Sequence, residues 1–296
     1  MLAKLKGFFG PGGRTSLERR FAIACETPQG SMSRVYRATD KESGRLICLK
    51  VQLPAKYAAA ASRAHRLERP TEGEIASKVV HPNVVRTYEH GVTTAGEQYM
   101  VMEFVDGVSL KFIREATKTG IRAKVKILAD AAEALAAVHA AGFIHHDVNP
   151  NNFLIDRENN VKLIDFGLAV PNTPAFQRPG NRTGMLHYMA PELIRRESTD
   201  ERIDIFGFGV MAFELLTDKL PFGGGTSLAQ LTQKINVDPL DPAVLNPRLS
   251  DELCEILRKT LTRRREARWP KMSTLAKALR SVPPRKGDKP DTNLAE

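Results

Sequence analysis

The chain changes character about one third of the way along, and this change limits the folds that it can adopt. Between residues 21 and 104 the sequence holds short β-prone runs, including Leu46–Val51 and Gln98–Phe104. Beyond Gly107, apolar residues recur at helical spacing, most clearly over 121–141. The pattern predicts an α+β chain in which a β-rich part precedes a longer helix-rich part.

Composition divides the chain into four segments. Residues 1–20 form a basic leader that Pro11 and several glycines should keep flexible. Residues 21–104 and 105–282 form the β-rich and helix-rich parts, and 283–296 are expected to be a disordered polar tail. Within the β-rich part, residues 55–79 look helical, with Pro70 opening a second helix as its first residue, and Val84–Tyr88 should form a strand.

Several classes of protein are disfavoured. No apolar run approaches the roughly 18 residues that cross a bilayer, and lysines interrupt the apolar stretch near the N-terminus, unlike a signal peptide. The cysteines Cys25, Cys48 and Cys254 are odd in number and include no C-x-x-C pair. We therefore expect neither a disulfide framework nor a zinc site, and we expect a cytoplasmic location.

The charge balance is strongly basic. Lys and Arg number 44 against 34 Asp and Glu, which gives a formal net charge of +10. The excess is concentrated in residues 1–20 and 258–280. These segments could contact an acidic protein or a membrane surface, although a solvated basic face is the simpler interpretation. No basic motif interleaved with aromatic residues indicates binding to nucleic acid.

The stretch 145–152, which reads His-His-Asp-Val-Asn-Pro-Asn-Asn, carries the strongest chemical signal. It follows the long predicted helix, and an Asp-Phe-Gly tripeptide begins 13 residues after Asn152. Asp147, Asn152 and Asp165 therefore bring oxygen-bearing side chains to two adjacent loops. Hard oxygen ligands of this kind suit Mg²⁺, whose coordination is usually completed by substrate phosphates.

The order and spacing of the motifs resemble those of the protein kinase family, and in particular the bacterial eukaryotic-like serine/threonine kinases. The resemblance covers roughly residues 21–281 and implies a bilobal fold, with a small β-rich N-lobe carrying one main helix and a larger helical C-lobe. It also implies that Arg268 pairs with Glu192. The motifs that carry it are Ile47–Lys50, Tyr99–Val105, His145–Asn152, Asp165–Gly167, Ala190–Glu192 and Asp204–Val210.

The resemblance further implies transfer of a phosphoryl group from ATP, with Mg²⁺, to a serine or threonine hydroxyl of a protein, as in signalling. Asp147 would orient or deprotonate the acceptor hydroxyl, and Lys50 would hold the phosphates. Glu72 would hold Lys50, with Glu74 as the second choice. Asn152 and Asp165 would bind Mg²⁺. The nucleotide would contact Pro28, Gly30, Val35, Cys48, Lys50, Leu154 and the backbone of Glu103 and Val105.

Four positions depart from the family pattern. The glycine loop keeps only Gly30, so we expect weaker nucleotide binding. His146 replaces an arginine that engages a phosphorylated loop, so we expect no dependence on phosphorylation of Thr173 or Thr183. Asn149, a candidate catalytic residue, replaces a lysine, and Met185 replaces a threonine. Losing such an electrostatic contact typically costs about 10²- to 10³-fold in rate.

Two alternatives to an active protein kinase remain open. The departures above would also suit a pseudokinase, a nucleotide-binding or scaffold module with weak or no phosphoryl transfer. A small-molecule phosphotransferase of similar fold is less favoured, because the Ala-Pro-Glu motif at 190–192 and the helix starting near Asp204 build a platform for a protein substrate.

Overall fold

The computed structural model describes residues 14–27, 33–53, 69–116, 119–179, 184–223 and 233–283, and it divides into two units. The first unit comprises the described residues up to 53 together with Thr87–Phe104. The second comprises residues 69–86 together with those from Val105 onward. The first is built on a sheet and the second mainly on helices, which confirms the α+β prediction. Residues 69–86 were expected with the β-rich part, but their backbone bonds to the helical unit, as in Val85 N to Leu163 O at 2.9 Å.

The first unit is an antiparallel sheet of five strands in the order β1-β2-β3-β5-β4. Side chains alternate between its two faces, and one face is buried in a core that includes Phe21, Leu49 and Tyr99. The predicted strand at Val84–Tyr88 begins later, at Thr87, because Val84 forms only an isolated bridge to Leu163 within the second unit. The strands are β1 (Phe21–Thr27), β2 (Ser33–Asp40), β3 (Leu46–Gln52), β4 (Thr87–Val92) and β5 (Gln98–Glu103).

Part of the expected flexible leader packs on this sheet. Residues 1–13 lie outside the described residues, but Thr15 N donates to Val92 O at 3.0 Å. Helix α1 (Leu17–Arg20) follows, and Leu17 packs against the core of the sheet. Partial burial of this leucine removes apolar surface from water and helps to hold these residues against the sheet. The glycines and Pro11, on which the expectation of flexibility rests, all precede residue 14. The expected tail also lies outside the described residues from 284 onward.

Helix α3 (Glu72–Ala76) begins two residues later than Pro70 predicts. The Thr71 hydroxyl accepts a bond from Glu74 N at 3.2 Å, and Glu74 Oε2 accepts one from Thr71 N at 2.7 Å. This reciprocal capping box fixes the start of the helix after Thr71, so the expectation for Pro70 was wrong. Residues 54–68 of the expected helical stretch lie outside the described residues.

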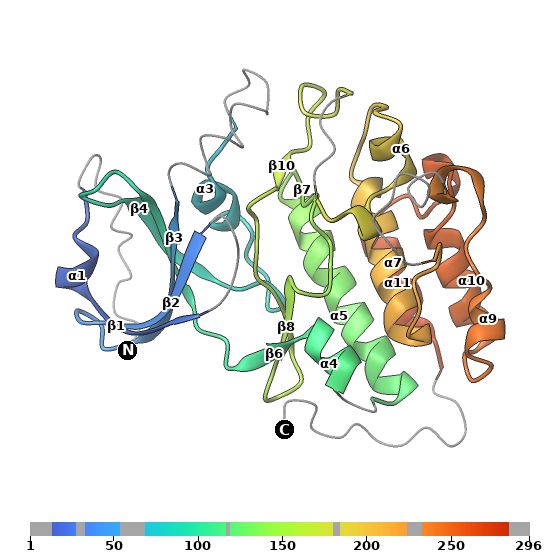
Figure 1. The fold of residues 1–296 in the computed structure, drawn as a ribbon, viewed down its shortest axis with the longest axis horizontal. Coiled ribbons are helices and arrows are strands. Elements are labelled where there is room, and N and C mark those ends of the chain that lie inside the picture. The colour runs from blue at the N-terminus through green and yellow to red at the C-terminus, as the bar shows by residue number, and fades with distance from the viewer. Residues whose placement is uncertain are drawn as a thin grey trace. The chain divides into compact units, whose positions relative to one another are not determined.

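The second unit is organised around α5 (Ile121–Ala140) and α7 (Arg202–Thr217), which lie among the other helices in Figure 1. Helix α5 matches the predicted helix over 121–141, and Gly142 follows it with a φ of +84°. Helix α7 is buried from Ile203 to Thr217. Besides α3, the other helices and 3-10 turns in the described residues of this unit are α4 (Leu110–Ala116), η1 (Leu186–Tyr188), α6 (Pro191–Ile194), α9 (Pro242–Leu245), α10 (Asp251–Thr260), η2 (Arg265–Ala267) and α11 (Met272–Ser281).

Two small sheets position the loops of the second unit. One contains β6 (Gly107–Ser109), β8 (Phe153–Asp156) and β9 (Val161–Leu163), and the other pairs β7 (Phe143–Ile144) with β10 (Val170–Pro171). Strand β8 starts directly after Asn152, and β9 ends two residues before Asp165. The antiparallel β8–β9 hairpin therefore brings the two predicted metal-binding loops side by side.

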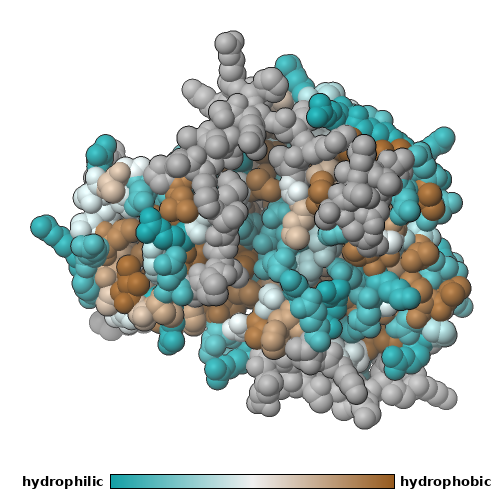
Figure 2. Space-filling model, viewed as in Figure 1, coloured by the Kyte–Doolittle hydropathy of each residue, from teal (hydrophilic) through white to brown (hydrophobic). Residues whose placement is uncertain are grey.

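None of the helices in the described part of the chain is long and apolar enough to cross a membrane. Figure 2 shows hydrophilic and hydrophobic residues interspersed over the described parts of the face in view. Such mixing is ordinary for a folded protein surface.

Candidate active site

The loop His145–Asn152 is anchored by the carboxylate of Asp204, which is 1% exposed near the start of α7. Its two oxygens accept bonds from His145 N at 2.7 Å and His146 N at 2.9 Å. His139 Nε2, from α5, lies 2.8 Å from Asp204 Oδ2. Burial alone would raise the pKa of Asp204, but the hydrogen bond from His139 keeps that pKa below its ordinary value. An ionised carboxylate thus holds the backbone just before Asp147.

His146 contributes no positive charge to this loop. Its ring nitrogen Nε2 is shielded from solvent, and its φ of +67° lies in the left-handed region. Burial lowers the pKa of His146 to about 4; the charge of Asp204 opposes this shift, and the charges of Arg69 and His145 add to it. The side chain is therefore neutral at neutral pH, unlike the arginine that it replaces in the family pattern.

Asp147 and Asn152 are in direct contact. Asn152 Nδ2 donates to Asp147 Oδ2 at 2.9 Å and to Asp147 O at 2.8 Å. The second loop is tied to the first, because Ile164 N donates to Asn152 O at 3.1 Å. Asp165 follows Ile164 directly, and its Oδ1 accepts a bond from Gly167 N at 2.8 Å. The three oxygen-bearing residues singled out in the sequence thus lie on two linked loops.

Asn149 is turned into the loop and is 2% exposed. Its Nδ2 donates to Asp147 O at 3.1 Å, and its Oδ1 accepts bonds from Asn151 N and Nδ2 at 3.0 and 3.2 Å. Every polar atom of this side chain is therefore engaged by the loop itself. The amide braces the backbone around Asp147, a role that the comparison with a lysine did not predict.

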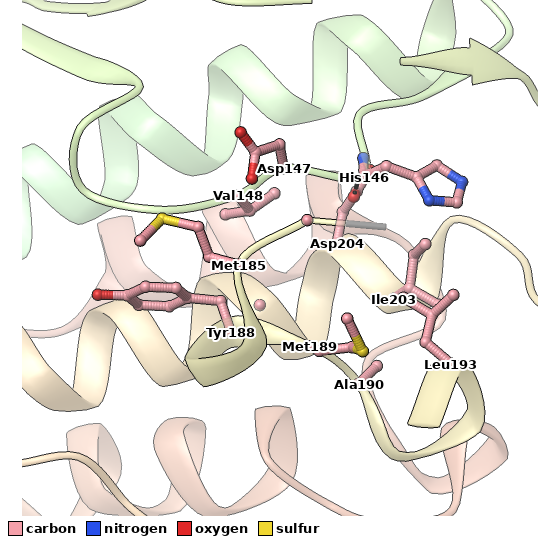
Figure 3. Close-up of a pocket in the computed structure, with 12 residues that line it drawn as sticks. His146, Asp147, Val148, Met185, Tyr188, Met189, Ala190, Leu193, Ile203 and Asp204 are labelled. Carbon is pink, nitrogen blue, oxygen red and sulfur yellow. Dashed lines mark hydrogen bonds between the residues drawn. The ribbon is translucent and has the colours of Figure 1, made fainter. Parts of the chain in front are cut away.

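A pocket lies beside Asp147, against the segment that leads into α6 (Figure 3). Gly184 has a φ of +90°, and a Cβ on it would lie 2.6 Å from His146 O, so only glycine allows this close approach. Met185 follows and is 42% exposed, with its sulfur 4.0 Å from Asn151 Nδ2. The pocket is lined by His146, Asp147, Val148, Gly184, Met185, Tyr188, Met189, Ala190, Leu193, Ile203, Asp204 and Gly207.

The expected pairing of Arg268 with Glu192 is present. Arg268 Nη1 and Nη2 donate to the two carboxylate oxygens at 2.7 and 2.8 Å, and both residues are buried. Arg268 also donates to backbone oxygens, including Thr262 O at 2.7 Å, and its guanidinium lies over the Phe206 ring. A bidentate pair with its remaining donors used is the geometry in which a buried ion pair is tolerated.

Of the two glutamates weighed as the partner of Lys50, Glu74 is used by the capping box of α3, whereas Glu72 is 4% exposed. Glu72 Oε1 accepts a bond from Phe166 N at 3.4 Å, so this carboxylate reaches the Asp-Phe-Gly segment. The geometry of the second unit therefore favours Glu72 over Glu74.

In the first unit, Val35, Cys48 and Lys50 share one face of the sheet. Val35 lies directly opposite Lys50, and Cys48 lies two residues before Lys50 on β3. Lys50 is 7% exposed, and burial raises the pKa of the Cys48 thiol to about 11. The thiol is therefore uncharged at neutral pH, and these three positions combine small apolar groups with one lysine.

The other expected nucleotide contacts are distributed as follows. Glu103 ends β5 in the first unit, whereas Val105 and Leu154 belong to the second unit. Pro28 and Gly30 lie outside the described residues. Arg69, Gly184 and His139 were not singled out from the sequence, although their contacts position the loops. The presence of His139 six residues before His145, together with Asp204 in α7, is a signal that could have indicated the contact between His139 and Asp204.

The donor set fits Mg²⁺ bound together with a phosphate substrate. Within the described ranges, no group of three or more His, Cys, Asp or Glu side chains could hold a metal by itself. Mg²⁺ is commonly held by one or two carboxylates plus substrate phosphates and water, and Asp165 with the amide oxygen of Asn152 supplies ligands of that type.

The comparisons with known proteins agree on one family, the protein kinases. Residues 26–279 match the model of the protein kinase domain. The serine/threonine-protein kinase PknB of Mycobacterium tuberculosis is 36% identical over 252 residues, covering 81% of this chain and 39% of that protein. The probable serine/threonine-protein kinase pknA2 of Bifidobacterium longum is 32% identical over 228 residues, covering 75% of this chain and 30% of that protein. The chain thus spans between about three and four tenths of the length of these relatives.

Proposed function

Because this chain belongs to the protein kinase family, we propose that it transfers the terminal phosphoryl group of ATP to serine or threonine hydroxyls of a protein. The observation that carries the proposal is the pair of linked loops that hold Asp147, Asn152 and Asp165, anchored by the buried Asp204. The relatives named above as serine/threonine-protein kinases support the choice of acceptor.

We assign each residue the role that the family pattern implies. Asp147 receives the proton of the acceptor hydroxyl or orients that hydroxyl, and Asn152 steadies one of its carboxylate oxygens. Lys50 holds the phosphates, with Glu72 as its partner. Asp165 and Asn152 hold Mg²⁺, which neutralises charge on the phosphates. Asn149 acts by holding the carbonyl of Asp147, and we assign it no contact with the phosphoryl group.

The adenine of ATP packs on the face that carries Val35 and Cys48, where the neutral thiol and the valine methyls suit an apolar ring. Leu154 also packs on the base, and the backbone of Glu103 and Val105 binds its edge. Pro28 and Gly30 cover the phosphates. These assignments follow the family pattern, and alanine substitution of each with measurement of ATP affinity tests them.

The two alternatives weighed from the sequence gain no support. The pattern of an intact Lys50, Asp147, Asn152 and Asp165 agrees with an active enzyme, and the relatives carry kinase names. The buried Arg268–Glu192 pair holds the α6 platform expected of kinases that act on proteins, which argues against a small-molecule substrate. The substitutions at Asn149 and Met185 lower the rate in this proposal and do not abolish it.

We further propose a reducing, cytoplasmic setting for the catalytic domain, supported by the three free cysteines. A protein is the proposed substrate, and any contact with an acidic protein or membrane would use the exposed basic side chains of 258–280. The proposed reducing setting is tested by measuring whether Cys25 and Cys48 are reduced in freshly isolated protein.

The function is tested by incubating the full chain with γ-labelled ATP, Mg²⁺ and a library of serine, threonine and tyrosine peptides. Labelled serine or threonine is expected, and sites of autophosphorylation are mapped in the same reaction. Asp147→Ala is the control and should remove the label, since the acceptor hydroxyl loses its proton acceptor. Transfer that persists in Asp147→Ala, or its absence from the wild-type chain, would contradict the proposal.

A further inference from the structure

Arg69, just before α3, and Glu72, its first residue, both form hydrogen bonds to the backbone that follows Asp165. Arg69 Nε donates to Ala169 O at 3.0 Å, and Arg69 Nη2 donates to Gly167 O at 2.7 Å. Glu72 Oε1 accepts the bond from Phe166 N. The Arg69 guanidinium thus donates to two carbonyl oxygens, while the Glu72 carboxylate accepts from the Phe166 amide just before them. Hydrogen bonds that involve an ionised group are stronger than those between neutral groups.

The backbone at Gly167, to which Arg69 is bonded, also orients Asp165. Gly167 N donates to Asp165 Oδ1 at 2.8 Å, while the carbonyl of the same glycine is held by Arg69. The ring of Phe166 is 1% exposed and contacts the ring of His145 edge-on, with centroids 5.6 Å apart. Because both backbone groups of Gly167 are engaged, moving Arg69 would loosen the turn that holds the Asp165 carboxylate.

Arg69 brings a positive charge to this segment. The position where the family pattern has an arginine is His146, whose side chain is neutral at neutral pH. Arg69 lies close enough to His146 for its charge to act on the imidazole. Guanidinium groups bind two acceptors in a fixed fork, which a neutral imidazole cannot do.

We propose that Arg69 is a positioning residue for phosphoryl transfer. It fixes the 166–169 backbone, and through it Asp165, with no need for a phosphate group on the segment that contains Thr173 and Thr183. The inference rests on the proposed function. The charged donor is part of the chain itself, so the segment is held from the moment of folding. Phosphorylation of Thr173 or Thr183 is then unnecessary for activity.

Two variants of the full chain test Arg69. Arg69→Met keeps most of the apolar stem and removes every donor, whereas Arg69→Lys keeps the charge and can reach one carbonyl at a time. Transfer from ATP to a serine peptide is measured against Mg²⁺ concentration. For Arg69→Met we expect kcat to fall at least tenfold and the Mg²⁺ concentration for half-maximal rate to rise severalfold. Arg69→Lys should recover part of both. Arg195→Met, which removes a bond to Ile235 O at 3.2 Å elsewhere in the same unit, should change neither.

A second readout does not depend on catalysis. Hydrogen exchange at the amides of Phe166, Gly167 and Ala169 should quicken at least tenfold in Arg69→Met, with exchange in α5 and α7 unchanged. If the wild type transfers no phosphate, the proposed function fails, while this exchange still tests the grip of Arg69. Exchange and Mg²⁺ requirement equal to the wild type would overturn the inference, whatever the change in kcat. Should Arg69→Met not fold, the same criteria apply to Arg69→Lys.

A separate variant tests whether activity depends on phosphorylation of Thr173 or Thr183. A Thr173→Ala/Thr183→Ala variant should keep the wild-type kcat within about twofold. A loss of tenfold or more would show that a phosphate on this segment is needed, and it would overturn that part of the inference.

Discussion

Asn149 shows how one polar side chain can shape the loop that carries Asp147. It is buried, and it bonds to the carbonyl of Asp147 and to two nitrogens of Asn151. A buried polar group that loses its partner costs roughly 1–3 kcal/mol, so these bonds are hard to give up once the loop has folded. The asparagine that stands where the family pattern has a lysine therefore has a structural role in this loop.

Asn149→Ala is expected to lower the free energy of unfolding by about 1–3 kcal/mol and to slow phosphoryl transfer tenfold or more, because Asp147 O and Asn151 N lose a buried partner. Denaturant unfolding and steady-state transfer to a serine peptide measure the two effects. Asn151→Ala is the matched control: its side chain donates to Asn149 and to the Met185 sulfur, so its loss should be smaller. Equal losses in the two variants would contradict the bracing role.

His146 should make the protein less stable in acid. Its pKa of about 4 in the folded state lies below the ordinary value of 6.5, so the unfolded chain takes up the proton first as pH falls. The stability contributed by the neutral ring is complete above pH 6.5 and is lost as pH falls towards 4. His146→Asn, which tolerates the left-handed backbone, should lose less stability over this window, by up to about 3 kcal/mol. Unfolding free energies measured at pH 7 and 4.5 that fall equally in both proteins would refute this.

Motif spacing was enough to predict that Asp147, Asn152 and Asp165 lie on adjacent loops, because these residues are close in the chain and a single hairpin joins their loops. The inward turn of Asn149 was not predictable, since it depends on the rotamer that the folded loop selects. The contact of Arg69 with Gly167 joins residues 98 positions apart, and no local pattern marks it. The sequence thus indicates which side chains are present at the site and leaves open which backbone groups hold them.

At the scale of elements, the best predictions are those set by one strong periodic pattern. Helix α5 has an apolar stripe over its whole length and was predicted within a residue at its ends. Strand β1 was not predicted, because its residues from Ala22 to Glu26 are exposed and lack an alternating apolar pattern. The start of α3 was wrong because a side-chain cap at Thr71 determines it more strongly than the proline does.

The segment from Gly184 to Tyr188 depends on close approach to the catalytic loop, so Gly184→Ala should displace it. The new Cβ would lie 2.6 Å from His146 O, on a residue whose φ is +90°. Strain of this kind costs about 1–3 kcal/mol, and we expect that loss in unfolding free energy together with a roughly hundredfold slower phosphoryl transfer. Gly120→Ala is the control, because its φ is −67° and no atom lies within 4 Å of the added Cβ. A Gly184→Ala variant as active as Gly120→Ala would contradict the packing described.

At the scale of the whole molecule, much of the basic excess in residues 258–280 is paired with groups of the same chain. Arg280, on α11, donates to Glu133 of α5 at 2.9 Å, and Arg268 is buried with Glu192. Lys259 lies over the Trp269 ring at 4.1 Å. Other arginines of the segment pair with nearby carboxylates, namely Arg258 with Asp241, Arg263 with Asp238 and Arg265 with Glu266. The count of charges therefore overstates the charge available to a partner.

Two triple variants separate the structural charges from the solvated ones, since each removes three positive charges. Arg258→Gln/Arg263→Gln/Arg280→Gln breaks ion pairs within the fold, and it should lower the free energy of unfolding by about 1–2 kcal/mol in total. Arg264→Gln/Lys271→Gln/Lys277→Gln changes exposed residues and should leave stability within about 0.5 kcal/mol of the wild type. If the basic face is merely solvated, the second variant should also bind vesicles containing phosphatidylserine as the wild type does. A clear loss of vesicle binding in that variant alone, at physiological salt, would show instead that these side chains form a docking surface for anions, because the fold would be unaffected.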